Sequence, residues 1–293
     1  MRILVFGKNG QVARALAGYL ENKDTRYLGS ADADLTVAGT ARQAIEAHKP
    51  EIIINAAAFT DVKSAETDVD SAESLNIAAP IEMAIAARKL NAAFVHISTD
   101  YVFDGKLDKP YKENMPTNPL NVYGRTKRDG EAGVLEENPD AVIMRTSWVF
   151  SEHGGNFLKT MLKISENQDS ATIIDDQIGG PTGADDIAGA IKKITERFAD
   201  AESRTPVQGG IYHFQGAPAV SWAGFAREIF DAADREMSVT PTLTKDYPSP
   251  VERPLRTVLD CRKIDGEFGV KQPDWRDATR AVVAKLLATG GSR

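Results

Sequence analysis

Residues 3–13 read Ile3-Leu4-Val5-Phe6-Gly7-Lys8-Asn9-Gly10-Gln11-Val12-Ala13, and the architecture of the chain follows from them. The four apolar residues predict a buried strand, and the apolar spacing that continues to Leu20 predicts a helix. Between them lies Gly-x-x-Gly-x-x-Ala, a reduced form of the glycine pattern of dinucleotide-binding βα units. Gly7 permits a tight turn, and Gly10 lets the backbone approach a pyrophosphate at the helix N-terminus. An ordinary strand–helix turn is the alternative interpretation.

Further apolar segments follow at the spacing of a parallel α/β fold, at 25–28, 51–54, 93–97 and 141–145. After Trp148 the pattern is mixed, with helices expected over 156–164, 185–198, 221–237 and 275–287 and strands over 171–174 and 210–214. The sequence therefore predicts a Rossmann-like doubly wound parallel sheet with a smaller mixed α/β substrate-binding domain. Residues 1–150 are predicted to bind a dinucleotide. Residues 151–293 are predicted to form mainly the substrate-binding domain, with segments that return to pack on the first.

Polar side chains follow the strand expected at 93–97. Ser98, Thr99 and Asp100 come at its carboxyl end, where ligands bind in open parallel sheets. Tyr123 and Lys127 are four residues apart, so one face of a helix presents both. An ammonium beside a phenol favours the phenolate and lowers the pKa of the phenol, which predicts a proton donor usable near neutral pH. Taken alone, the pair is more typical of an ordinary surface helix, but Thr99 upstream and the glycine-rich start of the chain favour the functional interpretation.

Composition excludes several classes of partner. The chain has 293 residues, 26% of them charged, and a net charge of −7 without a basic run, which argues against nucleic acid. It holds no apolar run long enough to span a membrane, and Ile3–Phe6 is too short for a signal peptide. The one cysteine, Cys261, allows no intrachain disulfide and is expected to be a packing residue. A reducing compartment fits, so we expect a cytoplasmic protein.

The end of the second strand does not distinguish NAD from NADP. An NAD site places an acidic residue near this point, and an NADP site places an arginine there. The chain has Gly29 and Ser30, then Asp32 and Asp34, and no basic residue until Arg42. We expect both NADPH and NADH to be used. A small preference for NADPH is expected, because Ser30 does not repel a 2′-phosphate.

Six motifs together resemble the extended short-chain dehydrogenase/reductases over nearly the whole chain. They are GKNGQV (7–12), NAAA (55–58), STDYVFDG (98–105), PLNVYGRTK (119–127), RTSWV (145–149) and GPTG (180–183). Within that family the sequence is similar to the branch that reduces the 4-keto group of dTDP-4-dehydro-L-rhamnose to dTDP-L-rhamnose. The resemblance implies an NADPH or NADH cofactor and a nucleotide-sugar substrate.

The resemblance also implies roles for individual residues. Tyr123 would donate the proton to the carbonyl oxygen, Lys127 would hold the nicotinamide ribose, and Thr99 would hydrogen-bond the same oxygen. Besides Tyr123 and Lys127, cofactor contacts are implied for Gly7, Asn9, Gly10, Gln11, Val12, Asp34, Leu35, Ala56, Ala57, Ala58, Phe59 and Thr60. Substrate contacts are implied for Thr99, Asp100, Tyr101 and Trp148.

One position departs from the family. Some members carry an acidic residue on the first helix that helps bind Mg²⁺ at a dimer interface, and this chain has Ala15 there. Asp185 could still be a ligand, but Mg²⁺ requires several oxygen ligands. We therefore assign no metal residues and expect turnover without Mg²⁺. A homodimer remains an expectation from the resemblance.

Other functions share these motifs. Another nucleotide-sugar ketoreductase, an epimerase or a dehydratase would use the same fold and the Tyr–Lys pair. A non-catalytic regulatory subunit resembling that of methionine adenosyltransferase is the alternative outside enzymes. The presence of Thr99, Tyr123 and Lys127 together favours an enzyme.

Overall fold

Six parallel strands form the central sheet, in the order β10-β5-β4-β3-β1-β2. This computed structural model describes residues 1–20, 24–200 and 206–290. The strands are β1 (Ile3–Phe6), β2 (Thr25–Leu28), β3 (Ile52–Asn55), β4 (Ala93–Thr99), β5 (Val142–Thr146) and β10 (Gly210–His213). The order reverses beside β1, as in a doubly wound fold, so the predicted fold class is confirmed.

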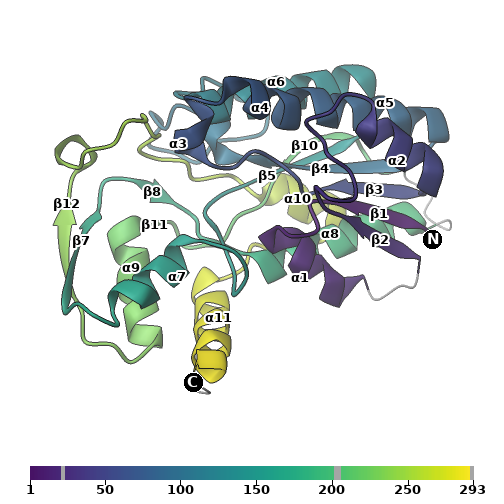
Figure 1. The fold of residues 1–293 in the computed structure, drawn as a ribbon. Coiled ribbons are helices and arrows are strands. Elements are labelled where there is room, and N and C mark those ends of the chain that lie inside the picture. Colours follow the sequence, from purple (N-terminus) through teal and green to yellow (C-terminus); the bar gives the residue numbers. More distant parts are fainter. Residues whose placement is uncertain (21–23, 201–205, 291–293) are drawn as a thin grey trace.

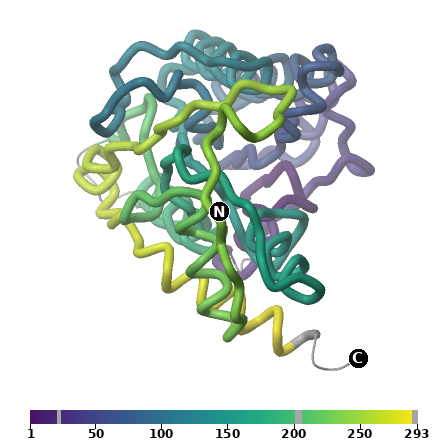
Figure 2. Tube along the Cα trace, turned by 90° about the vertical axis from the view of Figure 1, so that its left-hand side faces the viewer, coloured from purple at the N-terminus to yellow at the C-terminus, as the bar shows by residue number. Residues whose placement is uncertain are grey.

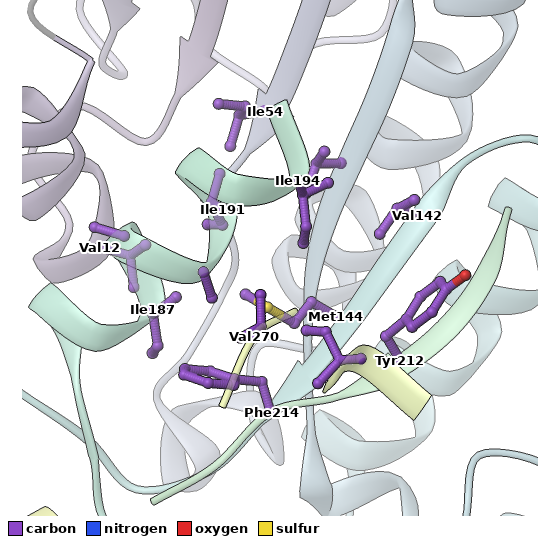
Figure 3. Packing of buried hydrophobic residues seen from close by; sticks show 14 of the residues in the cluster. Val12, Ile54, Val142, Met144, Ile187, Ile191, Ile194, Tyr212, Phe214 and Val270 are labelled. Carbon is purple, nitrogen blue, oxygen red and sulfur yellow. The ribbon is translucent and has the colours of Figure 1, made fainter. Parts of the chain in front are cut away.

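Helices cover both faces of the sheet (Figure 1). One face carries α1 (Gln11–Tyr19), α8 (Ala184–Ala199) and α10 (Arg262–Phe268). The other carries α2 (Thr40–His48), α5 (Ala79–Leu90) and α6 (Val122–Glu137). Ile187, Ile191 and Ile194 of α8 lie against the sheet side chains, among them Val142 and Met144 (Figure 3). The helices on the two faces of the sheet together hold the strand ends in position.

Four short elements pack against α6. They are α3 (Val62–Ala65), α4 (Val69–Glu73), the π-helix η1 (Ser74–Ala78) and the 3₁₀ turn η2 (Asp100–Val102). Asn76 in η1 has its side chain bonded to both backbone polar groups of Phe59 and to Thr126 Oγ1. The segment after β3 is thereby tied to α6.

A second lobe packs around α7 (Phe157–Ile164), α9 (Trp222–Ala232) and α11 (Trp275–Gly290). Its strands are short pairs: β6 (Val149–Phe150) with β9 (Thr182–Gly183), β7 (Ser170–Ile174) with β12 (Ser238–Thr242), and β8 (Ile178–Gly179) with β11 (Val220–Ser221). The chain then passes through η3 (Thr244–Asp246) and returns to the sheet at α10, as the yellow-green trace in Figure 2 shows. Tyr111 N–H donates to the Val258 carbonyl at 2.8 Å and so holds this return.

The helix expected over 221–237 is shorter than predicted. Ser221 caps α9 as expected, with its Oγ accepting from Gly224 N–H at 3.0 Å. The helix ends at Ala232, because Asp234 takes a left-handed conformation with φ of 52°. Residues 238–242 form β12 beside β7, a pairing that the helical pattern did not predict.

No helix in the described ranges is long and apolar enough to cross a membrane.

Candidate functional site

A cavity of about 720 Å³ opens at the carboxyl ends of the central strands. Among the residues with predicted roles, it is lined by Gly7, Asn9, Gly10, Gln11, Val12, Asp34, Leu35, Ala56, Ala57, Ala58, Thr60, Thr99, Asp100, Tyr101, Tyr123, Lys127 and Trp148. Phe59 lies outside this lining, because its backbone groups face the Asn76 side chain. The fold thus gathers segments from β1, β3, β4, α6 and the second lobe.

The glycine turn lies at one end of the cavity. Gly7 has φ of +94°, and a Cβ there would lie 2.7 Å from the backbone of Ala56, so only glycine fits. Gly10 precedes α1, and no side chain caps that helix. The first N–H groups of α1 are therefore available to a ligand, and an anion is favoured at this position.

The carboxylates near β2 have local partners. Asp34 Oδ1 accepts from the N–H and Oγ1 of Thr36, at 3.0 and 2.7 Å. Asp32 lies 3.7 Å from Lys8 Nζ and accepts from Gly29 N–H at 2.9 Å. These bonds keep the pKa of both carboxyl groups below the usual range. Ser30 also lines the cavity and adds no charge.

Thr99, Asp100 and Tyr101 follow β4 directly. Thr99 Oγ1 donates to Asp100 Oδ1 at 3.2 Å, and the other carboxylate oxygen of Asp100 accepts from Thr257 Oγ1. Burial raises the pKa of Asp100 to about 7. The Tyr101 ring meets Tyr123 edge to face, with centroids 5.5 Å apart. Two phenols, a hydroxyl and a buried carboxyl group therefore converge at the strand tip.

The expected effect of Lys127 on Tyr123 was wrong. Desolvation raises the pKa of Tyr123, and the Thr99 side chain opposes this only in part. Lys127 Nζ instead donates to the Ile97 carbonyl at 2.8 Å and lies 3.2 Å from His96 Nε2. Burial lowers the pKa of Lys127 itself to about 8. Tyr123 is therefore protonated at neutral pH, as a proton donor must be.

Two buried hydroxyls of the cavity wall have no hydrogen-bond partner among the residues that the structure describes. They are Ser98 Oγ and Thr146 Oγ1, at the ends of β4 and β5. Buried polar atoms are nearly always hydrogen-bonded, so these two positions fit a polar ligand. With the close approach at Gly7 and the open N-terminus of α1, the residues fit a dinucleotide.

Beside the predicted Trp148, the cavity is lined by Trp222 and Arg253, which the sequence did not single out. Trp148 has φ of 46°, and its ring stacks on Trp222 with centroids 3.5 Å apart. Arg253 lines the same cavity, and its Nε is buried without a hydrogen-bond partner. The proline-rich segment 248–254 marked this loop in the sequence, but nothing local indicated that its arginine lines the same cavity as Tyr123.

The residues at the family's metal position do not fit Mg²⁺. Lys285 Nζ binds Glu152 Oε1 at 2.8 Å and Asp185 Oδ2 at 3.1 Å. Ala15 adds no oxygen ligand, and Mg²⁺ requires near-octahedral oxygen coordination. Within the described ranges, no three or more His, Cys, Asp or Glu side chains gather as a metal site would require.

Comparison with known proteins identifies the family. The model of the RmlD substrate binding domain matches residues 1–288. A dTDP-4-dehydrorhamnose reductase of Aggregatibacter actinomycetemcomitans is 42% identical over 97% of this chain and 98% of its own. The crystal structure of such a reductase from Clostridium acetobutylicum has a TM-score of 0.90 at 32% identity, covering 98% of this chain and 100% of its own. That from Bacillus anthracis, in complex with NADP, has a TM-score of 0.89 at 30% identity, covering 97% and 99%.

These matches span both the sheet and the second lobe, and the resemblance drawn from the six motifs is confirmed. The chain therefore belongs to the RmlD substrate binding domain family, together with the dTDP-4-dehydrorhamnose reductases.

Proposed function

We propose that this chain reduces the 4-keto group of dTDP-4-dehydro-L-rhamnose to dTDP-L-rhamnose with NADPH or NADH. One observation supports it most directly: Tyr123, Thr99 and Lys127 line the same cavity as the glycine turn. The names of the relatives support the choice of substrate.

Tyr123 is the proton donor in this proposal. The bound dinucleotide supplies a hydride to the carbonyl carbon, and negative charge develops on the oxygen. Tyr123 donates its proton there, since its raised pKa keeps the phenol protonated until the carbonyl oxygen becomes the stronger base. Thr99 orients that oxygen with its hydroxyl.

Lys127 and the strand ends position the cofactor. The Lys127 ammonium would hold the ribose, while the N–H groups of Gln11 and Val12 would face the pyrophosphate. Asp34 and Leu35 would border the adenine. Ser98 Oγ and Thr146 Oγ1 would gain the hydrogen bonds that they lack in the protein alone.

We propose that the two parts of the chain have the functions that the sequence predicts. Residues 1–150 would hold the dinucleotide, and residues 151–293 would cover the substrate through Trp222 and Arg253. A homodimer and a cytoplasmic location complete the proposal. Sedimentation velocity would test the dimer.

A turnover assay tests the function. The substrate is generated enzymatically from dTDP-glucose, and oxidation of NADPH is followed by absorbance while the product is identified by NMR. Loss of absorbance with formation of dTDP-L-rhamnose is the expected result. Activity only on another nucleotide sugar would favour the other ketoreductases. Dinucleotide binding without turnover on any of them would favour the regulatory subunit.

Replacing Arg253 by Ala is expected to raise KM for the nucleotide sugar about 10–100-fold, the loss of one charge-assisted hydrogen bond. The guanidinium lines the cavity with an unpartnered Nε, and a diphosphate is the substrate group that it matches. Initial rates over a range of substrate concentrations measure it. Arg253→Lys, which keeps the charge but not the planar fork, should recover only part of the loss. An unchanged KM in Arg253→Ala would exclude this contact.

NADPH is expected to be somewhat preferred over NADH. Ser30 does not repel a 2′-phosphate, and Lys8 lies close to that strand end although it is paired with Asp32. Since no arginine fork is present there, the preference should be small. Steady-state kinetics with both cofactors measure it. A preference for NADH above about a hundredfold, roughly 2.7 kcal/mol, would contradict the prediction.

Turnover is expected to survive exhaustive EDTA treatment. The Glu152 and Asp185 carboxylates already share the Lys285 ammonium as a partner, and the proposed proton donor is a phenol. Initial rates before and after chelation measure it, with Ca²⁺ and Mg²⁺ added back separately. A loss of rate that only Mg²⁺ restores would show that other ligands bind it.

A further inference from the structure

Three buried side chains beneath the cavity connect β3 and β4 to α6. Asn55 is 1% exposed, His96 0% and Lys127 1%. Asn55 Nδ2 lies 3.1 Å from His96 Nδ1, and His96 Nε2 lies 3.2 Å from Lys127 Nζ. The imidazole therefore lies between an amide and an amine. Its tautomer decides from which of them it can accept a hydrogen bond.

The Asn55 amide is oriented by its other contact. Ala57 N–H donates to Asn55 Oδ1 at 3.0 Å, so Nδ2 faces the ring and donates to it. His96 Nδ1 must then accept, which places the ring hydrogen on Nε2, because a neutral imidazole has one donor and one acceptor nitrogen. An Nε2–H can donate to Lys127 only when the lysine is an uncharged amine, since an ammonium has no lone pair.

We propose that His96 is a positioning residue for Lys127: held as the Nε2–H tautomer by Asn55, it hydrogen-bonds the uncharged amine and favours that form. When Lys127 takes a proton from solvent, the ring hydrogen must move from Nε2 to Nδ1 for the ammonium to donate to Nε2. The bond from Asn55 is then lost. The charge of Lys127 and the tautomer of His96 therefore change together, and the imidazole is neutral in both states.

Lys127 Nζ has two direct polar neighbours: the Ile97 carbonyl, to which it donates at 2.8 Å whether the lysine is charged or not, and His96 Nε2 at 3.2 Å. Tyr123 and Glu131 lie on α6 itself, and Glu131 is paired with Arg145 of β5 at 2.6 Å. Burial lowers the pKa of Lys127 to about 8, with Glu131 opposing the shift. Burial, with the Lys127 charge, also holds the pKa of His96 well below its usual range, which keeps the ring neutral.

Imidazole ¹⁵N NMR on the chain without dinucleotide tests the tautomer directly. The sequence has four histidines, and variants that each lack one assign the signals. Above the Lys127 pKa of about 8, the His96 ring should carry its hydrogen on Nε2. The Nδ1–H form should increase as pH falls through the lysine titration. An Nδ1–H ring at high pH, or a charged ring near neutral pH, would overturn the proposal.

Asn55→Asp should reverse the tautomer of the His96 ring, so that Nδ1 carries the hydrogen. A carboxylate accepts from both Ala57 N–H and His96 Nδ1–H, which leaves Nε2 to accept from the Lys127 ammonium. The Lys127 pKa should then rise by roughly one unit, the lower end for a nearby opposite charge. Lysine ¹³Cε NMR measures it, with Lys127→Met assigning the signal, and the pH profile of kcat/KM should move in the same direction.

Asn55→Asp in a His96→Phe background is the matched control, because it adds the same charge without the ring. A smaller rise of the Lys127 pKa in this double variant than in Asn55→Asp alone supports the proposal, and an equal rise contradicts it. If the double variant does not fold, the His96 tautomer measured in the unaltered chain still tests the proposal. The inference rests on the proposed role of Lys127, but the NMR readout needs no turnover. A failed tautomer prediction is therefore distinct from a failed assignment of function.

Discussion

Replacing Tyr123 by Phe is expected to lower kcat about 10²–10⁴-fold, the usual share of general acid catalysis. The substitution removes the proton that meets the developing oxygen charge, and the ring that packs edge to face on Tyr101 remains. Rapid-quench or steady-state assays at saturating cofactor measure the loss. Dinucleotide affinity should change little, because the glycine turn belongs to a different segment of the cavity wall.

Tyr101→Phe is the matched control, since it removes a second phenol from the same cavity. Burial raises the pKa of Tyr101 to about 12, and its proposed role is a substrate contact. Tyr101→Phe should therefore change KM for the nucleotide sugar more than kcat. If Tyr123→Phe reduced the sugar at the rate of the unaltered chain, the proton donor would have to be another group.

Arg145→Met is expected to lower the free energy of unfolding by about 3–5 kcal/mol. Arg145 and Glu131 side chains are each only 3% exposed, and Nη2 lies 2.6 Å from Oε2. Arg145 Nε also donates to the same carboxylate, so the pair is bidentate. Removal of the guanidinium leaves a buried carboxylate without its cation, and such a charge is costly. Urea denaturation followed by circular dichroism measures the loss.

Two further variants separate charge from packing. Arg276→Met breaks an exposed pair with Asp274, with side chains 44% and 36% exposed, and should cost only about 0–1 kcal/mol. Arg145→Met combined with Glu131→Leu should recover part of the loss, because no buried charge remains. A loss for Arg145→Met as small as for Arg276→Met would contradict the account of the buried pair.

Much of the sheet was predictable because its signals are local. A strand such as β1 is buried on both faces, so its four residues are all apolar. Gly7 is needed within a few residues of the strand that it follows, and Tyr123 and Lys127 are one helical turn apart whatever surrounds them. The helix expected over 221–237 ends five residues early, at Ala232, and the strand β12 that follows it was not predicted. Strand β12 is stabilised by β7, about 70 residues earlier, and not by its own sequence.

The cavity wall was predictable in part for a different reason. Carboxyl ends of parallel strands meet at one edge of a sheet, so residues following β1, β3 and β4 had to lie near one another. Trp222 begins α9 and Arg253 lies in a loop, and the positions of both depend on how the second lobe packs. No periodicity in their own segments relates them to Tyr123.

The sequence by itself determined three features: the apolar segments that form the strands, the glycine turn and the Tyr123–Lys127 spacing. Only the tertiary structure decided the protonation states. A pKa depends on how far a group is removed from water and on which charges face it, and both come from residues distant in the sequence. Tyr123 and Lys127 are neighbours on α6, yet desolvation is the main cause of both pKa shifts, and Lys127 Nζ faces Ile97 and His96 of β4.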